Sequence, residues 1–170
     1  MNINIYNRLN VKDSQLFNRI IDLDKENMLE IFTNTNKGFP IEKRIKSFEL
    51  DGKVIVATRN EKLIGYLEYG NSWENPEDIY ISSLQIRKEN RGGKLFLYLL
   101  LKAQEDLKSS RFRYLISGVH VSNLKAINLY KKLGFSIENN QNTSSSYKVI
   151  ATPTILDNNL INKLNIREIL

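Results

Sequence analysis

A short segment of the chain combines a polar residue, a small residue and a phenol at helical spacing. Residues 123–135 read N-L-K-A-I-N-L-Y-K-K-L-G-F. On a helix, Asn123, Ala126, Tyr130 and Leu133 line one face. An ordinary buried face would be Leu or Val throughout. This face instead lets a ligand approach at the small residue and places two hydrogen-bonding groups beside it.

The same segment contains a helix stop signal. Gly134 is the expected left-handed terminator, and Phe135 begins the next apolar run. The spacing therefore predicts a helix over 123–133 that is followed by a strand. Taken alone, a Tyr on such a helix is usually a packing residue.

Segment 123–135 resembles the C-terminal acyl-donor motif of the GNAT superfamily of N-acetyltransferases, N-x-x-A-x-x-x-Y-x-x-x-G-F, with every fixed position filled. The resemblance implies that Asn123, Ala126 and Tyr130 lie beside the pantetheine arm of acetyl-CoA, and that Tyr130 protonates the departing thiolate. A phenol suits this step. With a pKa near ~10 it is protonated at neutral pH and can give its proton to a thiolate whose conjugate acid is near ~8.5.

The upstream half of the family signature is present in altered form. Family members bind the CoA pyrophosphate with R/Q-x-x-G-x-G/A between a strand and a helix, because backbone N–H groups at a helix N-terminus form an anion site. Here residues 87–96 read R-K-E-N-R-G-G-K-L-F. Aligning Arg91 with the first motif position puts Lys94 where Gly is expected and Phe96 where Gly or Ala is expected. These departures bear on the affinity for CoA and on the identity of the donor.

The resemblance thus assigns a strand end, a loop and a helix to the donor site. The residues are Leu84, Gln85, Ile86, Arg91, Gly92, Gly93, Lys94, Leu95, Phe96, Asn123, Ala126 and Tyr130. Basic residues gather around the loop, at Arg87, Lys88, Arg91 and Lys94. They form either an ordinary solvated loop or a surface that attracts the donor's phosphates. An acidic acyl-carrier protein would be drawn to the same surface.

The base that would deprotonate an amine acceptor is not evident from the sequence. Many GNAT proteins place Glu or Asp on the central strand, but here its middle reads I-S-S-L-Q-I. Glu68 on the preceding expected strand and His120 at the end of a later strand are the candidates, acting directly or through water. With so little apparatus for a strongly basic amine, we expect α-amino groups (pKa near ~8) to be better acceptors than lysine side chains (near ~10.4).

The elements expected to position these residues alternate between strand and helix. Strands are predicted at 3–8, 53–59, 62–69, 79–86, 113–121, 134–138 and 146–151. Helices are predicted at 13–33, 40–50, from about 96 to 107, and 123–133. Asn60 and Glu61 are expected to form a hairpin turn. This order agrees with the α/β fold that the resemblance implies, a central mixed twisted sheet with helices on both faces.

Composition narrows the classes of function. The 170 residues are 41% hydrophobic and 26% charged, which fits one globular domain over 1–151 with an extension over 152–170, expected to be helical and to pack on the domain or on a second subunit. The absence of Cys and the single His disfavour a metal centre. No apolar run reaches the ~20 residues of a membrane span, and no signal peptide is evident, so a cytoplasmic protein is expected.

The sequence thus favours transfer of an acetyl group from acetyl-CoA to an amine of a small molecule or peptide, without a metal. One alternative is a GNAT-like binding or regulatory protein with a weakened CoA site. Another is use of a different acyl donor. The net charge of +6 permits nucleic-acid binding, but the basic residues are spread along the chain, which makes this partner unlikely. A homodimer remains open.

Overall fold

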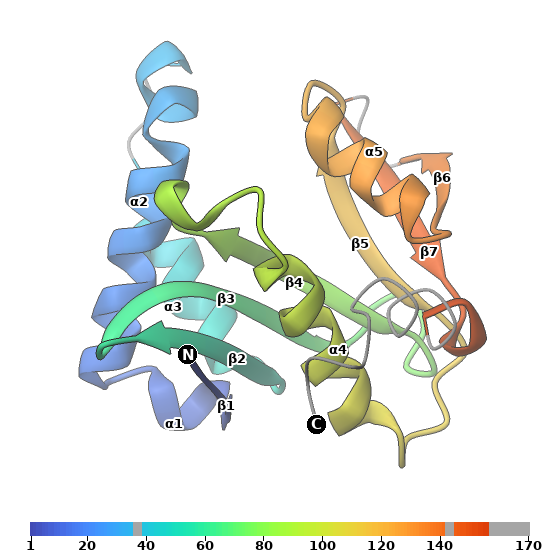
Figure 1. Cartoon of the computed structure of the whole chain (residues 1–170), viewed down its shortest axis with the longest axis horizontal. Helices are drawn as coiled ribbons and strands as arrows, with labels where there is room; N and C mark the ends of the chain where they lie inside the picture. Colours follow the sequence, from blue (N-terminus) through green and yellow to red (C-terminus); the bar gives the residue numbers. More distant parts are fainter. Residues whose placement is uncertain (36–38, 142–144, 157–170) are drawn as a thin grey trace. The chain divides into compact units, whose positions relative to one another are not determined.

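The structure is a computed structural model that describes residues 1–35, 39–141 and 145–156 (Figure 1). Its elements follow the order β1 (Asn2–Asn7), α1 (Arg8–Val11), α2 (Gln15–Thr35), α3 (Ile41–Glu49), β2 (Lys53–Arg59), β3 (Lys62–Asn71), β4 (Ile79–Ile86), the 3-10 helix η1 (Lys88–Asn90), α4 (Leu95–Leu107), β5 (Leu115–His120), α5 (Leu124–Lys132), β6 (Ser136–Asn139) and β7 (Ser146–Ala151). Seven strands of the described residues are hydrogen-bonded in the order β1-β2-β3-β4-β5-β7-β6. The predicted mixed α/β architecture is confirmed.

The chain divides into two compact units. The first contains Met1–Glu68 and Ser83–Leu99, and the second contains Tyr69–Ser82 and the chain from Leu100 onward. Strands β3 and β4 and helix α4 each contribute residues to both units. The predicted extension over 152–170 lies outside the described residues from position 157 on.

In the first unit, β1 pairs antiparallel with β2, from Asn2 opposite Thr58 to Asn7 opposite Lys53. The predicted turn at Asn60 and Glu61 joins β2 to β3. Both turn residues have positive φ, 48° and 61°, as the two central residues of a type I′ hairpin turn require.

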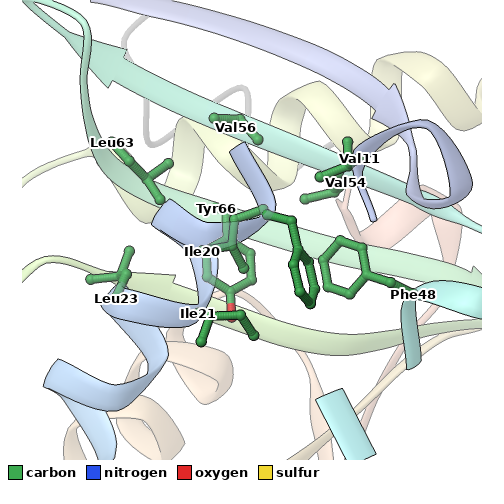
Figure 2. Close-up of a cluster of buried hydrophobic side chains, with 10 residues drawn as sticks. Val11, Ile20, Ile21, Leu23, Phe48, Val54, Val56, Leu63 and Tyr66 are labelled. Atoms are coloured by element: carbon green, nitrogen blue, oxygen red, sulfur yellow. The ribbon is translucent and has the colours of Figure 1, made fainter. Parts of the chain in front are cut away.

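An apolar core fills the first unit (Figure 2). Its buried members come from helices α1, α2 and α3 and from strands β2 and β3: Val11, Phe17, Ile20, Ile21, Leu23, Phe48, Val54, Val56, Leu63 and Tyr66. The rings of Phe17 and Phe48 meet edge to face with centroids 4.9 Å apart. This packing fixes α2 and α3 against the sheet, and so fixes the polar side chains that the two helices carry.

In the second unit, the first residues of β4 pair in parallel with β5, from Ile79 opposite Leu115 to Ile81 opposite Ser117. Strand β7 pairs antiparallel with both β5 and β6. In Figure 1, α5 lies alongside these C-terminal strands. Helix α5 starts one residue later than predicted, because Asn123 caps it rather than belonging to it. The short α1 was not predicted.

Candidate functional site

The two compact units divide the predicted site residues between them. Glu68, the strand end Leu84–Ile86 and the loop from Arg91 to Phe96 belong to the first unit. His120, Asn123, Ala126 and Tyr130 belong to the second. Each group is built from its own local contacts.

The loop after β4 presents an uncovered stretch of backbone. Residues 91–94 are exposed, and a Cβ added at Gly92 or Gly93 would meet no atom within 4 Å. Gly92 has a φ of +85°, and α4 begins at Leu95. Open backbone just before a helix N-terminus fits an anion such as a pyrophosphate. The loop therefore presents uncovered backbone just before α4, and its binding of the CoA phosphates stays a prediction.

Arg91 is held by the protein itself. Its Nε donates to the Ile86 carbonyl at 3.0 Å, and its Nη2 donates to Oδ1 of Asn27 on α2. The Asn27 amide also donates to Gln85 Oε1 at 2.9 Å and to the Ile86 carbonyl at 3.2 Å. Arg91 thus fixes the loop to the end of β4 and to α2. Its guanidinium is therefore already held in place by the protein.

Replacing Gly92 with Ala should destabilise the protein more than replacing Gly93. Neither new methyl group would meet a neighbour, so the difference rests on the backbone. At a φ of +85° an L-residue is strained, by about 1–2 kcal/mol for a left-handed conformation. Urea unfolding of both variants measures this, with Gly93→Ala as the matched control. Equal losses of unfolding free energy would contradict the expectation.

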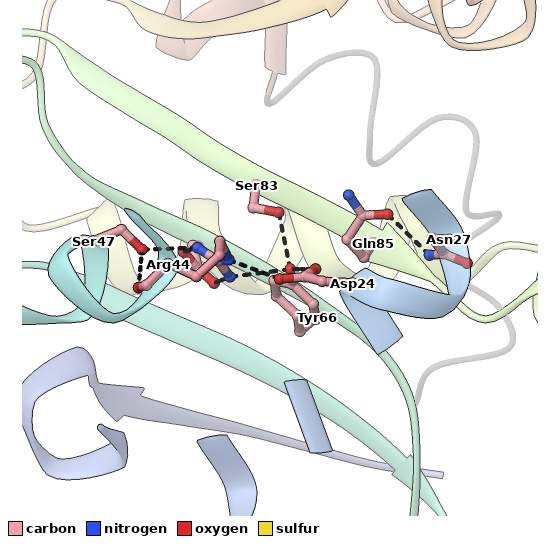
Figure 3. A network of polar contacts seen from close by, with 8 residues as sticks. Asp24, Asn27, Arg44, Ser47, Tyr66, Ser83 and Gln85 are labelled. Carbon is pink, nitrogen blue, oxygen red and sulfur yellow. Dashed lines mark hydrogen bonds and ion pairs between the residues drawn. The ribbon is translucent and has the colours of Figure 1, made fainter. Parts of the chain in front are cut away.

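The first unit also contains a buried polar network centred on Arg44 of α3 (Figure 3). The guanidinium donates to Asp24 Oδ2 through Nε at 2.7 Å, to Ser47 Oγ through Nη1 at 2.8 Å, and to the Tyr66 hydroxyl through Nη2 at 3.3 Å. Both oxygens of Glu68 accept from it, at 2.6 and 3.2 Å. All five N–H donors of Arg44 therefore have partners.

Glu68, a predicted candidate base, lies within this network. Its side chain is fully buried and paired with Arg44 in a two-point arrangement. Such a two-point pair fixes the orientation of the carboxylate. In this position Glu68 anchors Arg44, and a proton would have to reach it through other groups.

Asp24, Tyr66 and Ser83 form a second branch of the network (Figure 3). The Tyr66 hydroxyl donates to Asp24 Oδ1 and lies 3.0 Å from Ser83 Oγ. Burial raises the pKa of Asp24, although the ion pair with Arg44 opposes the shift. Burial likewise raises the pKa of Tyr66 well above its ordinary value. Asp24 and Tyr66 are buried, whereas Ser83 is half-buried.

In the second unit, Asn123 and Tyr130 occupy the two ends of α5. The Asn123 side chain accepts from the Ala126 backbone N–H at 3.2 Å, an N-cap contact. At the other end Gly134 has a φ of +83°, as predicted. The Phe135 and Gly134 N–H groups donate to the carbonyls of Tyr130 and Lys131, both at 3.0 Å, which is the Schellman arrangement.

Tyr130 is buried, and its ring meets the Phe135 ring edge to face at 4.9 Å. Its hydroxyl is hydrogen-bonded to the Ser117 side chain, which itself donates to the Ile81 carbonyl at 3.1 Å. Burial raises the pKa of Tyr130, so the phenol stays protonated at neutral pH. The residue therefore packs in the core of the second unit, and its role as a proton donor stays a prediction.

His120 ends β5 and is exposed. Its Nδ1 lies 2.7 Å from Ser122 Oγ and accepts from the Ser122 N–H at 3.3 Å. These contacts fix the orientation of the ring through Nδ1. The role of His120 as a base stays a prediction.

Sequence reasoning missed Asp24 and Arg44. Both lie on amphipathic helices, where charged residues ordinarily face water. Their only advance signal was a position next to apolar residues of the core face, Leu23 for Asp24 and Ile45 for Arg44. Nothing in the sequence linked Ser83 or Tyr66 to a carboxylate.

The described residues contain no candidate metal site and no candidate membrane-spanning helix. No group of His, Cys, Asp or Glu in the described ranges is arranged to hold a metal ion. Among the helices there, none has the length and apolar character that crossing a bilayer requires.

A model of the acetyltransferase (GNAT) family matches residues 18–135. A curated relative, the spore coat polysaccharide biosynthesis protein SpsD of Bacillus subtilis (strain 168), is 26% identical over 84 residues. That match covers 49% of this chain and 28% of the relative, so the matched segment is less than a third of that protein's length.

Solved structures share the fold. The PaiA N-acetyltransferase of Thermoplasma acidophilum, solved in complex with coenzyme A, matches with a TM-score of 0.67 and 20% identity, over 89% of this chain and 99% of that one. An aminoglycoside 6'-acetyltransferase type Ii matches with a TM-score of 0.69 and 15% identity, over 90% and 97%. A ribosomal-protein-alanine N-acetyltransferase of Brucella melitensis matches with a TM-score of 0.59 and 16% identity, over 89% and 99%.

Proposed function

Because the chain belongs to the GNAT family of acetyltransferases, we propose that it transfers an acetyl group from acetyl-CoA to an amine of a small molecule or peptide. The observation that carries the proposal is the complete acyl-donor motif on α5. Its Asn caps the helix, its Gly ends the helix, and its Tyr keeps a buried, protonated hydroxyl. A relative solved with coenzyme A supports the choice of donor.

The donor is proposed to contact three parts of the chain. The open backbone at Gly92 and Gly93 would take the pyrophosphate, with Lys94, Leu95 and Phe96 at the start of α4. Asn123 and Ala126 would lie beside the pantetheine arm. The backbone N–H groups from Leu84 to Ile86 would polarise the thioester carbonyl.

The reaction needs no covalent enzyme intermediate. The amine attacks the thioester carbon, the carbon–sulfur bond breaks, and its electron pair leaves on sulfur. Tyr130 is the proposed donor of the proton that the thiolate takes up. The proton released by the amine goes to a base, for which Glu68 and His120 were the candidates in the sequence.

The proposal is tested by following CoA release and product mass with amino acids, polyamines, aminoglycosides and short peptides as acceptors. We expect transfer to α-amino groups at neutral pH and slower transfer to lysine side chains, because a larger fraction of an α-amino group is neutral there. CoA, dephospho-CoA and pantetheine are titrated in parallel by calorimetry. CoA binding without transfer to any amine would overturn the enzymatic function.

A binding or regulatory protein with a weakened CoA site is the second candidate, favoured by Lys94 and Phe96 in place of small residues. This alternative predicts that CoA and pantetheine bind with equal affinity, or that neither binds. In that case replacing Phe96 with Ala should restore tighter binding of CoA if the ring crowds the pyrophosphate.

A further inference from the structure

We propose that Ser83, Tyr66 and Asp24 form a proton relay that accepts the proton of the acceptor amine, with Asp24 as its end point. The inference rests on the proposed acyl transfer and identifies a path to a base that the sequence did not. All three residues lie in the first unit, on β4, β3 and α2 respectively. Ser83 directly precedes the strand segment proposed to polarise the thioester.

The direction of the relay follows from counting hydrogens. The Tyr66 hydroxyl has one hydrogen, and it donates this to Asp24 Oδ1. The bond of 3.0 Å between Tyr66 and Ser83 must then use the hydrogen of Ser83. The lone pairs of Ser83 Oγ accept from no other group among the described residues. Ser83 therefore offers a hydrogen-bond acceptor, as an approaching N–H group requires.

Arg44 and Glu68 hold this relay in place. Arg44 Nε pairs with Asp24 Oδ2, which leaves Oδ1 for Tyr66. Arg44 Nη2 contacts the Tyr66 hydroxyl, and the two-point pair with Glu68 fixes the guanidinium plane. Arg8, also buried, interacts electrostatically with Glu68. Tyr66 connects Asp24 to Ser83 on β4.

The transfer balances. When the amine nitrogen has bonded to the thioester carbon, its N–H proton passes to Ser83 Oγ, the Ser83 hydrogen passes to the Tyr66 oxygen, and the Tyr66 hydrogen passes to Asp24 Oδ1. Ser83 and Tyr66 end neutral, and Asp24 becomes a carboxylic acid. Sulfur takes a proton from Tyr130. After product release, Asp24 returns its proton to solvent by the reverse path, and Tyr130 regains one.

Burial favours Asp24 as the end point. It raises the pKa of this carboxyl, which makes the carboxylate a stronger base than an exposed one. Tyr66 keeps a raised pKa and so passes a proton on rather than losing one. Both carboxylate oxygens of Glu68, by contrast, accept hydrogen bonds from Arg44.

The test compares Asp24→Asn, Tyr66→Phe and Ser83→Ala, using acetyl-CoA and the amine of the panel that wild type acetylates fastest. We expect kcat to fall by roughly 10²-fold or more in each, as for loss of a general base, with acetyl-CoA affinity unchanged. Ser83→Thr keeps the hydroxyl and should retain most activity. The acidic limb of the pH profile should lose the part that comes from Asp24 in Asp24→Asn, and should keep only the part set by the pKa of the acceptor amine.

Tyr69→Phe is the matched control. Tyr69 lies on β3, the same strand as Tyr66, and its hydroxyl donates to another carboxylate, Asp106 of α4, at 2.6 Å. Removing that hydroxyl should leave kcat unchanged. Melting temperatures check that each variant is folded. Infrared difference spectra of wild type and Asp24→Asn follow the carboxyl without turnover and should show it protonating above its ordinary pH range.

The outcomes separate the two proposals. Failure of wild type to acetylate any amine overturns the proposed function and the relay with it. Normal transfer by wild type with a folded Asp24→Asn that keeps its rate and its pH profile overturns the relay alone. Loss of activity in Asp24→Asn but not in Tyr66→Phe or Ser83→Ala would also overturn it, because the proton would then travel by another route.

Discussion

Replacing Tyr130 with Phe is expected to lower turnover by roughly 10²–10⁴-fold, the usual contribution of a positioned proton donor. The substitution keeps the ring, and with it the edge-to-face contact with Phe135 that closes α5. It removes the hydroxyl that is hydrogen-bonded to Ser117. Steady-state kinetics with acetyl-CoA and the best amine acceptor measure the effect, and acetyl-CoA affinity should stay close to that of wild type.

The pH dependence adds a second check on Tyr130. Because burial raises the pKa of this phenol above its ordinary value near ~10, it stays protonated throughout the neutral range. Wild-type kcat should therefore show no basic limb from Tyr130 below that pH. Tyr114→Phe removes a phenol that stacks beside Arg113 and serves as the control. If Tyr130→Phe turned over as fast as this control, Tyr130 would be a packing residue only.

Replacing Arg44 with Met is expected to lower the free energy of unfolding by about 3–5 kcal/mol, the usual cost of leaving a buried charge without its partner. The change removes the partner of two buried carboxylates, Asp24 and Glu68. Met fills much of the same volume, so the loss reports on charge rather than on a cavity. Urea unfolding of both proteins measures it. Lys12→Met, which removes an exposed ion pair with Glu49, is the control and should change stability little.

The sign of the pH effect distinguishes charge from packing in Arg44→Met. The folded-state pKa of Asp24 is already raised by burial, and it should rise further without Arg44. A carboxyl whose pKa is raised by folding contributes its full stabilisation at pH values below its pKa in the unfolded chain, near ~3.9. That contribution is lost as the pH rises through its pKa in the folded protein. The stability deficit of the variant should therefore shrink as the solution is acidified from neutral pH. A deficit independent of pH would show that lost packing is responsible.

The sequence by itself determined most of the elements and two of their boundaries. The turn at Asn60 and Glu61 and the helix stop at Gly134 depend on local backbone preferences, and both occur where they were predicted. The strand predicted at 79–86 and the helix predicted from about 96 to 107 correspond to β4 and to α4, which begins at Leu95. The acyl-donor motif could be identified from the sequence because its residues lie along one helix, where their spacing determines which side chains share a face.

Only the tertiary structure decided which polar groups meet. Asp24, Arg44, Tyr66 and Ser83 come from α2, α3, β3 and β4, and the contacts that join them span 17 to 42 residues of sequence. Periodicity tells which face of a helix is apolar, but not which charged residue at the border of that face will be covered by another element. A hydrogen bond also depends on distances of a few tenths of an ångström. The packing of Phe17, Phe48 and their neighbours sets those distances. It thereby brings Asp24 of α2 and Arg44 of α3 together as an ion pair that is largely shielded from water.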